Sequence, residues 1–381
     1  MKHFKASIIL VVFILTIQEG LSQGCVAIRG FSSCSGNMSA GFSLAKGEFL
    51  AGAGLRYFKS FRHFRGSEEE HNRIEDGTQV VNYSYFLDLS LNVGITNRLY
   101  GNVVLPFVHH NRSSMYEHGG NPPNGLGQRN ETSSKGLSDI RLGMGYWLVD
   151  PKKGKKYNYA VGLGLKLPTG NYDYKDTFYN QGENRNETRT AVVDQSIQPG
   201  DGGTGITLDI QGYHSLSHYF TLSTNLFYLS NFQSTNGVPT RNGRSEFSCP
   251  DQYAARVGVY YNTSIHGLSA YFGGRVEGVS SEDLIGSSEG YRRPGYAMSI
   301  EPGISYNRNN YSFNLGVPVA LVRNRTQSYE DKKRTSDTGN YTHGDAAFAD
   351  YLLSFTFSYR LGGSHKMPTE IDVNWKTDDN N

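Results

Sequence analysis

The sequence has no apolar run long enough to cross a membrane as a helix. Its one continuous apolar stretch, from Ile8 to Ile17, is about half the length of a membrane-spanning helix, which needs about 20 residues. The mean hydropathy of −0.50 also describes a polar chain. A bundle of transmembrane helices is therefore excluded.

Net charge and cysteine are also scarce. The chain has 37 Lys and Arg against 35 Asp and Glu, a formal net charge of +2, which is too small for a protein that binds nucleic acid through bulk positive charge. The three cysteines, Cys25, Cys34 and Cys249, have no spacing that suits a zinc site. We therefore expect no nucleic-acid partner, no metal and no cofactor.

Glycine and aromatic residues, by contrast, are abundant. The 381 residues include 45 Gly, 26 Tyr and 20 Phe. Tyrosine and phenylalanine favour strands, and glycine in such number is unusual in helical proteins. The composition predicts an all-β protein, and a single large barrel can reach this length.

The first residues have the layout of a secretory signal peptide. Lys2 and Lys5 precede the apolar run, and Ser22 to Gly24 supply small residues for cleavage. The alternative, a retained N-terminal anchor, is disfavoured because the run is short. We predict that residues 1–24 are a signal peptide and that the protein is exported.

Cys25 directly follows the predicted cleavage site. It is either lipidated or bonded to Cys34 in an oxidising compartment, and the sequence leaves both alternatives open. In either case we expect Cys249 to be a free thiol in a loop.

Apolar and polar residues alternate strictly along much of the chain. Between residues 82 and 95, every second residue from Tyr83 to Ile95 is apolar, whereas the other series is polar except for Phe86. This period of two predicts strands with one apolar face. Nearly all such segments are long enough to cross a membrane as tilted strands. The twelve segments are approximately 48–60, 80–95, 98–109, 138–149, 157–168, 203–214, 219–231, 252–263, 267–278, 295–307, 311–323 and 350–362.

Short and long connections alternate between these segments. Five are short, and six are long and polar: 61–79, 110–137, 169–202, 232–251, 279–294 and 324–349. This alternation predicts a transmembrane antiparallel up-and-down β-barrel of about 12 strands, with short periplasmic turns, long extracellular loops and both ends at the short-turn rim. The alternative is a soluble sandwich or barrel. Its strands would be shorter, and it would not place Tyr and Phe at the ends of the apolar series.

The polar series of the strands carries charges that we predict to line the lumen. The six cations are Arg56, Arg141, Lys166, Arg256, Arg275 and Arg360, and the five anions are Asp88, Asp139, Asp209, Glu277 and Glu301. Because unpaired charge in a narrow bore is costly, we expect these groups to pair across it. The pairs would form either a structural network that fills the barrel or a polar track that selects small solutes.

Two segments flank the predicted barrel, which covers residues 48–362. Residues 25–47 are rich in Ser and Gly, and we expect them to hang in the periplasm or to enter the lumen as a plug. The charged tail 363–381 has no hydrophobic pattern, and we predict a disordered periplasmic extension.

Three segments resemble a known family. Gly136 to Gly143 (GLSDIRLG), Gly164 to Gly170 (GLKLPTG) and the glycine-rich stretch from Gln198 to Gly205 resemble the outer-membrane barrel family labelled "MetA-pathway of phenol degradation". The resemblance covers about residues 80–360. It implies a channel or transporter for small, often hydrophobic or aromatic molecules. The segments Arg112–His118 and Tyr57–Phe64 resemble a gliding, Bacteroidetes-type branch, for which no defined substrate is implied.

Enzymatic sites have little support in the sequence. The stretch Gly200–Gly205 looks like a phosphate-binding loop, but it lacks the G-K-[ST] ending and precedes a strand. His109 with Ser113 or Ser114 comes nearest to the dyad of outer-membrane phospholipases, but no nucleophile motif surrounds it. We therefore expect that the protein is not an enzyme.

The sequence as a whole favours an outer-membrane barrel that works as a passive channel or transporter. The solute would diffuse through the charge-lined lumen, gated by the long loops or by residues 25–47. Two alternatives remain: a structural or adhesion barrel with a closed lumen and partner-binding loops, and an outer-membrane hydrolase. The expected partners are outer-membrane lipid, the barrel-assembly machinery and a small-molecule solute.

Overall fold

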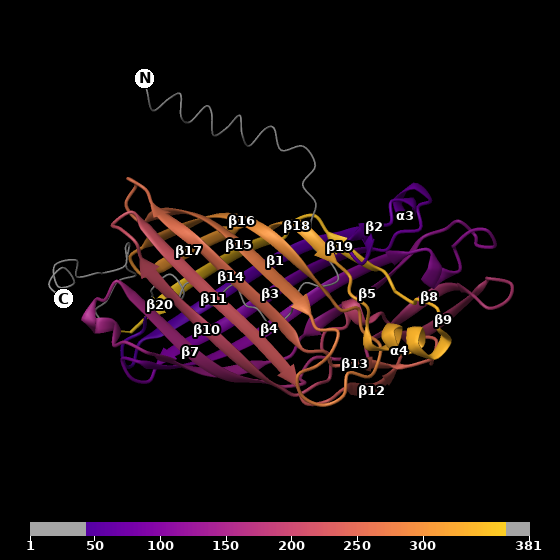
Figure 1. Cartoon of the computed structure of the whole chain (residues 1–381), viewed down its shortest axis with the longest axis horizontal. Coiled ribbons are helices and arrows are strands. Elements are labelled where there is room, and N and C mark those ends of the chain that lie inside the picture. Colours follow the sequence, from indigo (N-terminus) through magenta and orange to yellow (C-terminus); the bar gives the residue numbers. More distant parts are fainter. Residues whose placement is uncertain (1–42, 363–381) are drawn as a thin grey trace, which may run out of the picture.

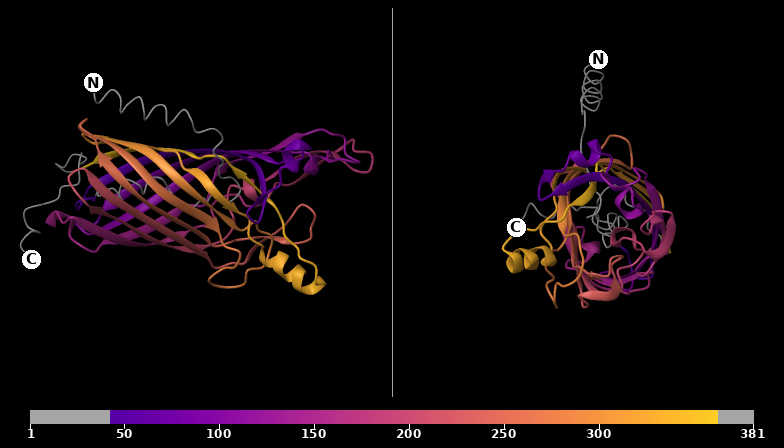
Figure 2. Two further views of the ribbon diagram at one scale, coloured as in Figure 1. Left: turned by 45° about the horizontal axis from the view of Figure 1, so that its top comes forward. Right: turned by 90° about the vertical axis from the view of Figure 1, so that its right-hand side faces the viewer.

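The alternating segments fold into the wall of a barrel, as the computed structural model shows (Figures 1 and 2). The structure describes residues 43–362. The predicted signal peptide 1–24, most of the segment 25–47, the tail 363–381 and both Cys25 and Cys34 lie outside the described residues.

The wall contains twelve strands, of which nine are continuous and three are interrupted. The continuous strands are β1 (Phe49–Arg65), β3 (Val81–Gly94), β4 (Leu99–Ser114), β7 (Tyr157–Lys166), β10 (Gly205–Ser215), β11 (Phe220–Asn231), β14 (Gln252–Asn262), β15 (Leu268–Val279) and β16 (Gly295–Arg308). The interrupted strands are β5 (Asn130–Leu137) with β6 (Arg141–Trp147), β17 (Tyr311–Gly316) with β18 (Val319–Asn324), and β19 (Ala346–Ala349) with β20 (Leu353–Leu361).

Each wall strand pairs antiparallel with its neighbours in the chain, and the last pairs with the first. The closing pair joins β1 to β20, in register from Phe49 opposite Leu361 to Tyr57 opposite Leu353. The predicted closed antiparallel barrel is therefore confirmed.

The connections alternate in length as predicted. Short turns span residues 95–98, 148–156, 216–219, 263–267 and 309–310, and long loops span 66–80, 115–129, 167–204, 232–251, 280–294 and 325–345. The start of β1 and the end of β20 lie at the same rim as the short turns. In outer-membrane barrels this is the periplasmic rim.

The long loops contain secondary structure that the sequence did not predict. The predicted loop 110–137 is shorter than expected, because β4 and β5 extend the wall to Ser114 and from Asn130. The additional elements are β2 (Glu68–Glu69), α3 (Asn72–Glu75), η2 (Tyr116–His118), β8 (Lys175–Gln181), β9 (Glu187–Val192), η4 (Gln195–Ile197), β12 (Thr235–Pro239), β13 (Glu246–Ser248) and α4 (Tyr329–Thr338), with η3 (Pro151–Lys153) in a short turn. No helix in the described part of the chain is long and apolar enough to span a membrane.

Three predicted segments differ from the strands that form. The segment 311–323 breaks at Pro318, which has no backbone N–H to donate to the ladder. The segment 138–149 starts late, because Asp139 turns away from the ladder and accepts backbone N–H groups from Gly170 and Asp201. The segment 350–362 also starts late, at Leu353 in β20, and β19 lies before it, in the stretch predicted as the end of the loop 324–349.

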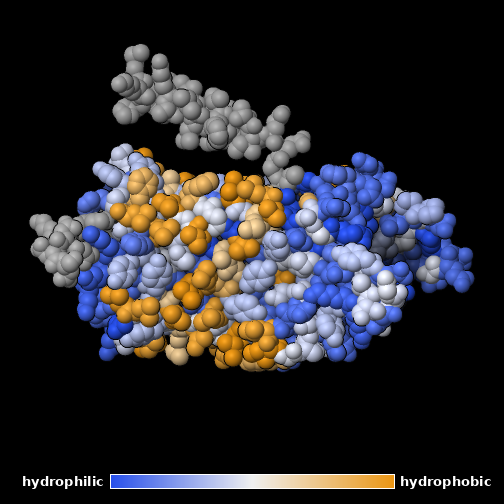
Figure 3. Space-filling model, in the orientation of Figure 1, coloured by the Kyte–Doolittle hydropathy of each residue, from blue (hydrophilic) through white to orange (hydrophobic). Residues whose placement is uncertain are grey.

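The outer face of the barrel is apolar. On β3, Leu89 and Leu91 are exposed, whereas Asp88, Ser90 and Asn92 on the opposite face are buried. The same relation holds around the wall, and Figure 3 shows the apolar side chains gathered over the strands, with hydrophilic residues over the loops. A soluble barrel would turn this face inward, so the belt is that of a transmembrane barrel.

Aromatic pairs flank the belt at both levels. Tyr57 and Tyr85 lie 5.0 Å apart towards the long loops. Tyr311 and Tyr359 lie 4.8 Å apart towards the short turns. These rings occupy the interfacial positions that Tyr favours in membrane barrels.

Candidate functional site

The eleven charged residues predicted to line the lumen lie on the face opposite the apolar belt. Nine of them are buried, namely Arg56, Asp88, Asp139, Arg141, Lys166, Arg275, Glu277, Glu301 and Arg360. Asp209 and Arg256 are half-buried. Asp209 lies within electrostatic range of Arg141.

The ion pairs of this set follow the wall. Asp88 lies 3.4 Å from Arg56 on the neighbouring strand and 4.0 Å from Arg141, one strand further on. Arg256 on β14 contacts Glu301 on β16 at 3.0 Å, across the intervening strand β15. These pairs connect nearby strands, whereas we expected pairing across the bore. The reason is geometric, since adjacent strands lie only about 4.8 Å apart.

Two further ion pairs recruit partners that the sequence did not indicate. Glu48, which precedes β1, lies 2.6 Å from Arg360 on β20 and so bridges the two strands that close the barrel. Lys166 contacts Asp139 at 3.8 Å and also pairs with Asp201, which comes from a long loop. Asp201 therefore joins the lumen wall to the loops.

Part of the longest loop folds inward. We call residues Val193–Asp201 the inward segment. Val193 and Ile197 have no exposed surface, and Gln198 is buried. Gln198 accepts the backbone N–H of Tyr174 at 2.9 Å and donates to the carbonyl of Val193 at 3.0 Å, so the segment is fixed to its own loop. Its burial means that it occupies space within the barrel mouth.

The three family-like motifs meet where the inward segment joins the wall. Asp139 accepts the backbone N–H of Gly170 at 3.0 Å and that of Asp201 at 3.1 Å. The hydroxyl of Ser138 donates to the carbonyl of Pro199, and Thr169 donates to the carbonyl of Ser138 at 2.9 Å. These contacts form a motif junction, which holds the inward segment to β6 and β7.

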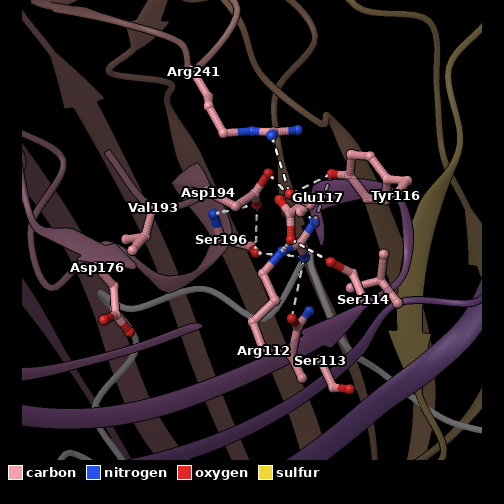
Figure 4. Close-up of polar contacts among 12 residues, drawn as sticks. Arg112, Ser113, Ser114, Tyr116, Glu117, Asp176, Val193, Asp194, Ser196 and Arg241 are labelled. Atoms are coloured by element: carbon pink, nitrogen blue, oxygen red, sulfur yellow. Dashed lines mark hydrogen bonds and ion pairs between the residues drawn. The ribbon is translucent and has the colours of Figure 1, made fainter. Parts of the chain in front are cut away.

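Charged groups hold the other end of the inward segment. Arg293 donates two hydrogen bonds to the carboxylate of Asp194, at 2.7 and 2.8 Å. Arg112 approaches Asp194 at 3.5 Å and donates to Glu117 at 2.9 Å and to the hydroxyl of Tyr116 at 2.9 Å. Figure 4 shows Arg112 between Asp194 and Glu117, with Arg241 above them. We call these residues the Asp194 network.

Electrostatics keep the Asp194 network ionised. Burial opposes the ionisation of Asp194, but Arg112 and Arg293 outweigh it and hold the pKa of this carboxyl well below its usual range. Burial, followed by the charge of Glu117, raises the pKa of Tyr116, which stays a neutral hydroxyl. Asp194, Arg112 and Arg293 are therefore fixed charges at neutral pH.

A large basin lies among the long loops. Its volume is about 890 Å³, and Val193 and Asp194 of the inward segment contribute to its lining. The rest of the lining comes mainly from the loops after β4, β12, β15 and β18, with α4 at one side. Most of the charged side chains in this lining are arginines.

A smaller pocket lies on the other side of the inward segment. Ser196, Gln198 and Asp201 line it, together with aromatic side chains. Three phenylalanines contribute, namely Phe58, Phe86 and Phe247. Its volume of about 80 Å³ is several times the roughly 10–15 Å³ that one water needs. Phe247, Arg292 and Arg293 line both the pocket and the basin.

The sequence analysis missed the apolar part of this region. Phe58, Phe86 and Val108 form a buried cluster with Ala349 and Leu352 inside the barrel. Phe86 is the one apolar residue in the polar series of residues 82–95. Phe58 on β1 and Val108 on β4 also face inward. Apolar residues in the inward-facing series of three neighbouring strands could therefore have indicated this cluster from the sequence.

The candidate dyad that the sequence analysis set aside does not form. His109 and Ser113 lie on the same face of β4, four residues apart, which is about 13 Å at the usual rise of a strand. Ser114 points to the buried face and donates to Glu117 at 2.7 Å. Within residues 43–362, no group of three or more His, Cys, Asp and Glu residues is placed to hold a metal ion.

The fold is similar to that of solved outer-membrane proteins. An outer membrane channel of Pseudomonas putida F1 matches at 11% identity with a TM-score of 0.56, over 84% of this chain and 97% of that one. A FadL homologue of Pseudomonas aeruginosa matches at 8% identity and a TM-score of 0.42, over 90% and 99% of the two chains. The Pseudomonas putida toluene transporter TodX matches at 10% identity and a TM-score of 0.40, over 84% of this chain and 91% of that one. At such identities the likeness concerns the fold alone.

Sequence comparison identifies the family. No curated protein matches the chain. The closed wall and its apolar belt place the protein in the cell outer membrane. The family described as "Putative MetA-pathway of phenol degradation" matches residues 70–274, a stretch that includes the motif junction and the inward segment. This match covers more than half of the chain, and the protein therefore belongs to that family.

Proposed function

We propose that the protein is an outer-membrane channel that passes a small, hydrophobic or aromatic solute from the loop basin, past the inward segment, into the charge-lined lumen. No reaction is part of this function. The inward segment narrows the route, and the Asp194 network and the motif junction hold it in place at its two ends.

The observation that carries the proposal is the continuity between the basin and the pocket. Phe247, Arg292 and Arg293 line both spaces. The inward segment separates them, with Val193 and Asp194 on the basin side and Ser196 and Asp201 on the pocket side. A solute that enters the basin therefore meets the three shared residues at the border of the phenylalanine-lined pocket.

Two further observations favour a route for a solute rather than a barrel filled by a structural network. The named ion pairs of the lumen connect nearby strands, as Arg256 with Glu301 does, and none of them joins opposite sides of the bore. The pocket combines phenylalanine rings with amide and carboxylate groups, which suits a small molecule with an aromatic part and a polar part. The family description, which refers to phenol degradation, agrees with such a solute.

Single-channel recording in planar bilayers tests the proposal. The full-length protein is expected to give discrete current steps. To connect the current to the route, Asn236→Cys is introduced in a background where Cys25 and Cys34 are serine, because Asn236 lines the pocket. A positively charged methanethiosulfonate reagent added from the loop side is expected to reduce the current through this variant.

The matched control is Ser287→Cys, since Ser287 is exposed in a loop and lies outside both linings. The same reagent is expected to leave its current unchanged. Absence of current from correctly folded, inserted protein would reject the channel and favour the structural or adhesion barrel. Equal block of both variants would reject the proposed route.

The finer resemblance of Arg112–His118 to a Bacteroidetes-type branch stays a prediction. In the structure this segment supplies Arg112, Tyr116 and Glu117 to the Asp194 network. We therefore expect members of that branch to use the same segment to hold an inward segment of their own.

A further inference from the structure

We propose that the loop basin is a binding site for a small organic anion, whose acidic group is held by the arginines and whose apolar part enters the phenylalanine-lined pocket. This inference rests on the proposed function and names the chemical class of its solute. An aromatic carboxylate has the required chemistry.

The lining of the basin is strongly cationic. It contains nine Arg and Lys side chains against six carboxylates, an excess of three positive charges. The whole chain has a net charge of only +2, so positive charge is concentrated at this one place. A concave surface of one sign raises the local concentration of solutes of the opposite sign.

Most carboxylates of the basin are already paired. Glu117 and Asp194 are held by Arg112 and Arg293. Asp331 contacts Arg325 at 3.1 Å, and Asp345 contacts Arg73 at 3.6 Å. Four of the six carboxylates are therefore paired with arginines of the same lining. The excess positive charge lies on the cations that remain.

Two of these cations have no acidic partner within the described residues. Arg241 donates one hydrogen bond to the carbonyl of Glu117 at 3.2 Å, and its guanidinium lies 5.1 Å from the centre of the Phe178 ring. Arg244 is exposed in the same loop and lines the basin. A guanidinium offers five N–H donors, so Arg241 retains several for a ligand.

Two buried arginines add unused donors. Arg292 and Arg325 are 1% and 3% exposed. Their terminal nitrogens contact Asp283 and Asp331, but the Nε of each has no hydrogen-bond partner within residues 43–362. An unsatisfied buried N–H is costly, and a bound anion would satisfy it.

The excess charge also affects the lining itself. Burial lowers the pKa of Arg325 below its ordinary value, and the neighbouring Arg293 lowers it further, although Asp331 opposes both. A bound anion would relieve this repulsion.

The position of Arg292 links the anion to the apolar pocket. Arg292 and Phe247 line the basin and the pocket together, and Phe58 and Phe86 lie on the pocket side. An acidic group bound at Arg292 therefore has apolar rings on one side. This arrangement favours an anion with an aromatic ring over a simple inorganic anion.

Isothermal titration calorimetry with the full-length protein in detergent tests the inference. Sodium benzoate is expected to bind at least about tenfold more tightly than benzyl alcohol, which lacks the charge, and than sodium acetate, which lacks the ring. The double variant Arg241→Gln/Arg244→Gln is expected to weaken benzoate by at least about tenfold and to leave benzyl alcohol unchanged.

Two further variants guard against trivial effects. Lys152→Gln/Lys153→Gln removes the same charge from exposed positions at the short-turn rim and is expected to bind benzoate as the wild type does. Arg292→Lys keeps the charge beside Asp283 but removes the Nε donor, and weaker benzoate binding is expected. Unchanged benzoate binding in Arg292→Lys would show that the buried Nε donor does not contact the anion.

The outcomes separate this inference from the proposed function. No benzoate binding at millimolar concentration, equal binding of benzoate and benzyl alcohol, or unchanged binding in the Arg241/Arg244 variant would overturn the anion site. Current steps from the same preparation would still support the channel. Benzoate binding without any current would keep the site and reject the channel.

Discussion

Gly200 lies directly against Gly170, although 30 residues separate them in the chain. A Cβ atom added to Gly200 would lie 2.6 Å from the carbonyl oxygen of Gly170, and one added to Gly170 would lie 2.8 Å from the Cα of Gly200. Both glycines belong to motifs by which the family is recognised. The motifs are therefore explained by a close backbone contact, which holds the inward segment to the wall.

We expect Gly200→Ala to destabilise the protein by about 1–3 kcal/mol, because backbone atoms rather than flexible side chains occupy the space of the new methyl group. The measurement is the urea midpoint of the electrophoretic shift between folded and unfolded barrel. Gly274→Ala is the control, since the nearest atom to its added Cβ is the carbonyl oxygen of Ser299 at 4.0 Å. Equal midpoints for the two variants would contradict the contact.

Asp194→Asn is expected to loosen the inward segment without unfolding the wall. It leaves the half-buried Arg293 without its carboxylate and the buried Arg112 with Glu117 alone, which costs less than the roughly 3–5 kcal/mol of breaking a fully buried pair. Amide hydrogen exchange over residues 193–201 measures this local opening. Asp173→Asn removes an exposed ion pair with Lys175 and should change exchange little. Unchanged protection in Asp194→Asn would show that the network does not hold the segment.

The Asp194 network is expected to withstand mild acid. Arg112 and Arg293 depress the folded-state pKa of Asp194 against the effect of burial. A depressed pKa gives stability that is fully present above the unfolded value of about 3.9 and is lost only as the pH falls through the folded value. Protection of residues 193–201, corrected for intrinsic exchange, should be the same at pH 7 and at about pH 5. A loss of protection between these values would indicate a different partner for Asp194.

Leu163→Arg is expected to impair insertion. Leu163 is 62% exposed on β7, in the middle of the apolar belt, where a charge facing lipid costs about 2–4 kcal/mol. Folding into lipid vesicles, followed by the electrophoretic shift, measures the effect. Leu284→Arg is the matched control, because Leu284 is 73% exposed but lies in a long loop. Similar folding of both variants would place the belt outside the lipid.

Cys249 is expected to be unreactive in the folded protein. Its side chain is fully buried, and burial, followed by the charge of Asp201, raises the pKa of the thiol. Maleimide labelling at pH 8, with Cys25 and Cys34 replaced by serine, should fail in the folded state and succeed after denaturation. Ser287→Cys in the same background should label when folded. Rapid labelling of Cys249 in folded protein would mean that its loop opens.

Much of the barrel could be predicted because each side chain of a strand points to one of only two faces of the sheet. The alternation from Tyr83 to Ile95 indicates the outward face of β3 without knowledge of any other strand. The alternation of short and long connections then determines the strand order. The sequence analysis expected one continuous strand over 311–323. Pro318 in that segment has no backbone N–H for a ladder and is the sequence feature that indicates the interruption.

The candidate site was much less predictable. The charged lining residues could be named from alternation, but their partners could not, since Glu48 and Asp201 lie outside the alternating segments. The inward segment lies in a long polar loop with no periodic pattern. Nothing in its residues indicates that Asp194 meets Arg112 and Arg293, which are 82 and 99 residues away.

By itself the sequence determined the class of fold, the apolar outer face, the polar inner face and the rim at which the first wall strand starts and the last one ends. These are consequences of a period of two and of loop length, both of which are local. Only the tertiary structure decided that the ion pairs follow the wall, that the motifs meet through Gly170 and Gly200, and that arginines from several loops surround one basin. The physical reason is that barrel closure and loop packing bring together residues far apart in the chain, and such contacts leave no periodic signal.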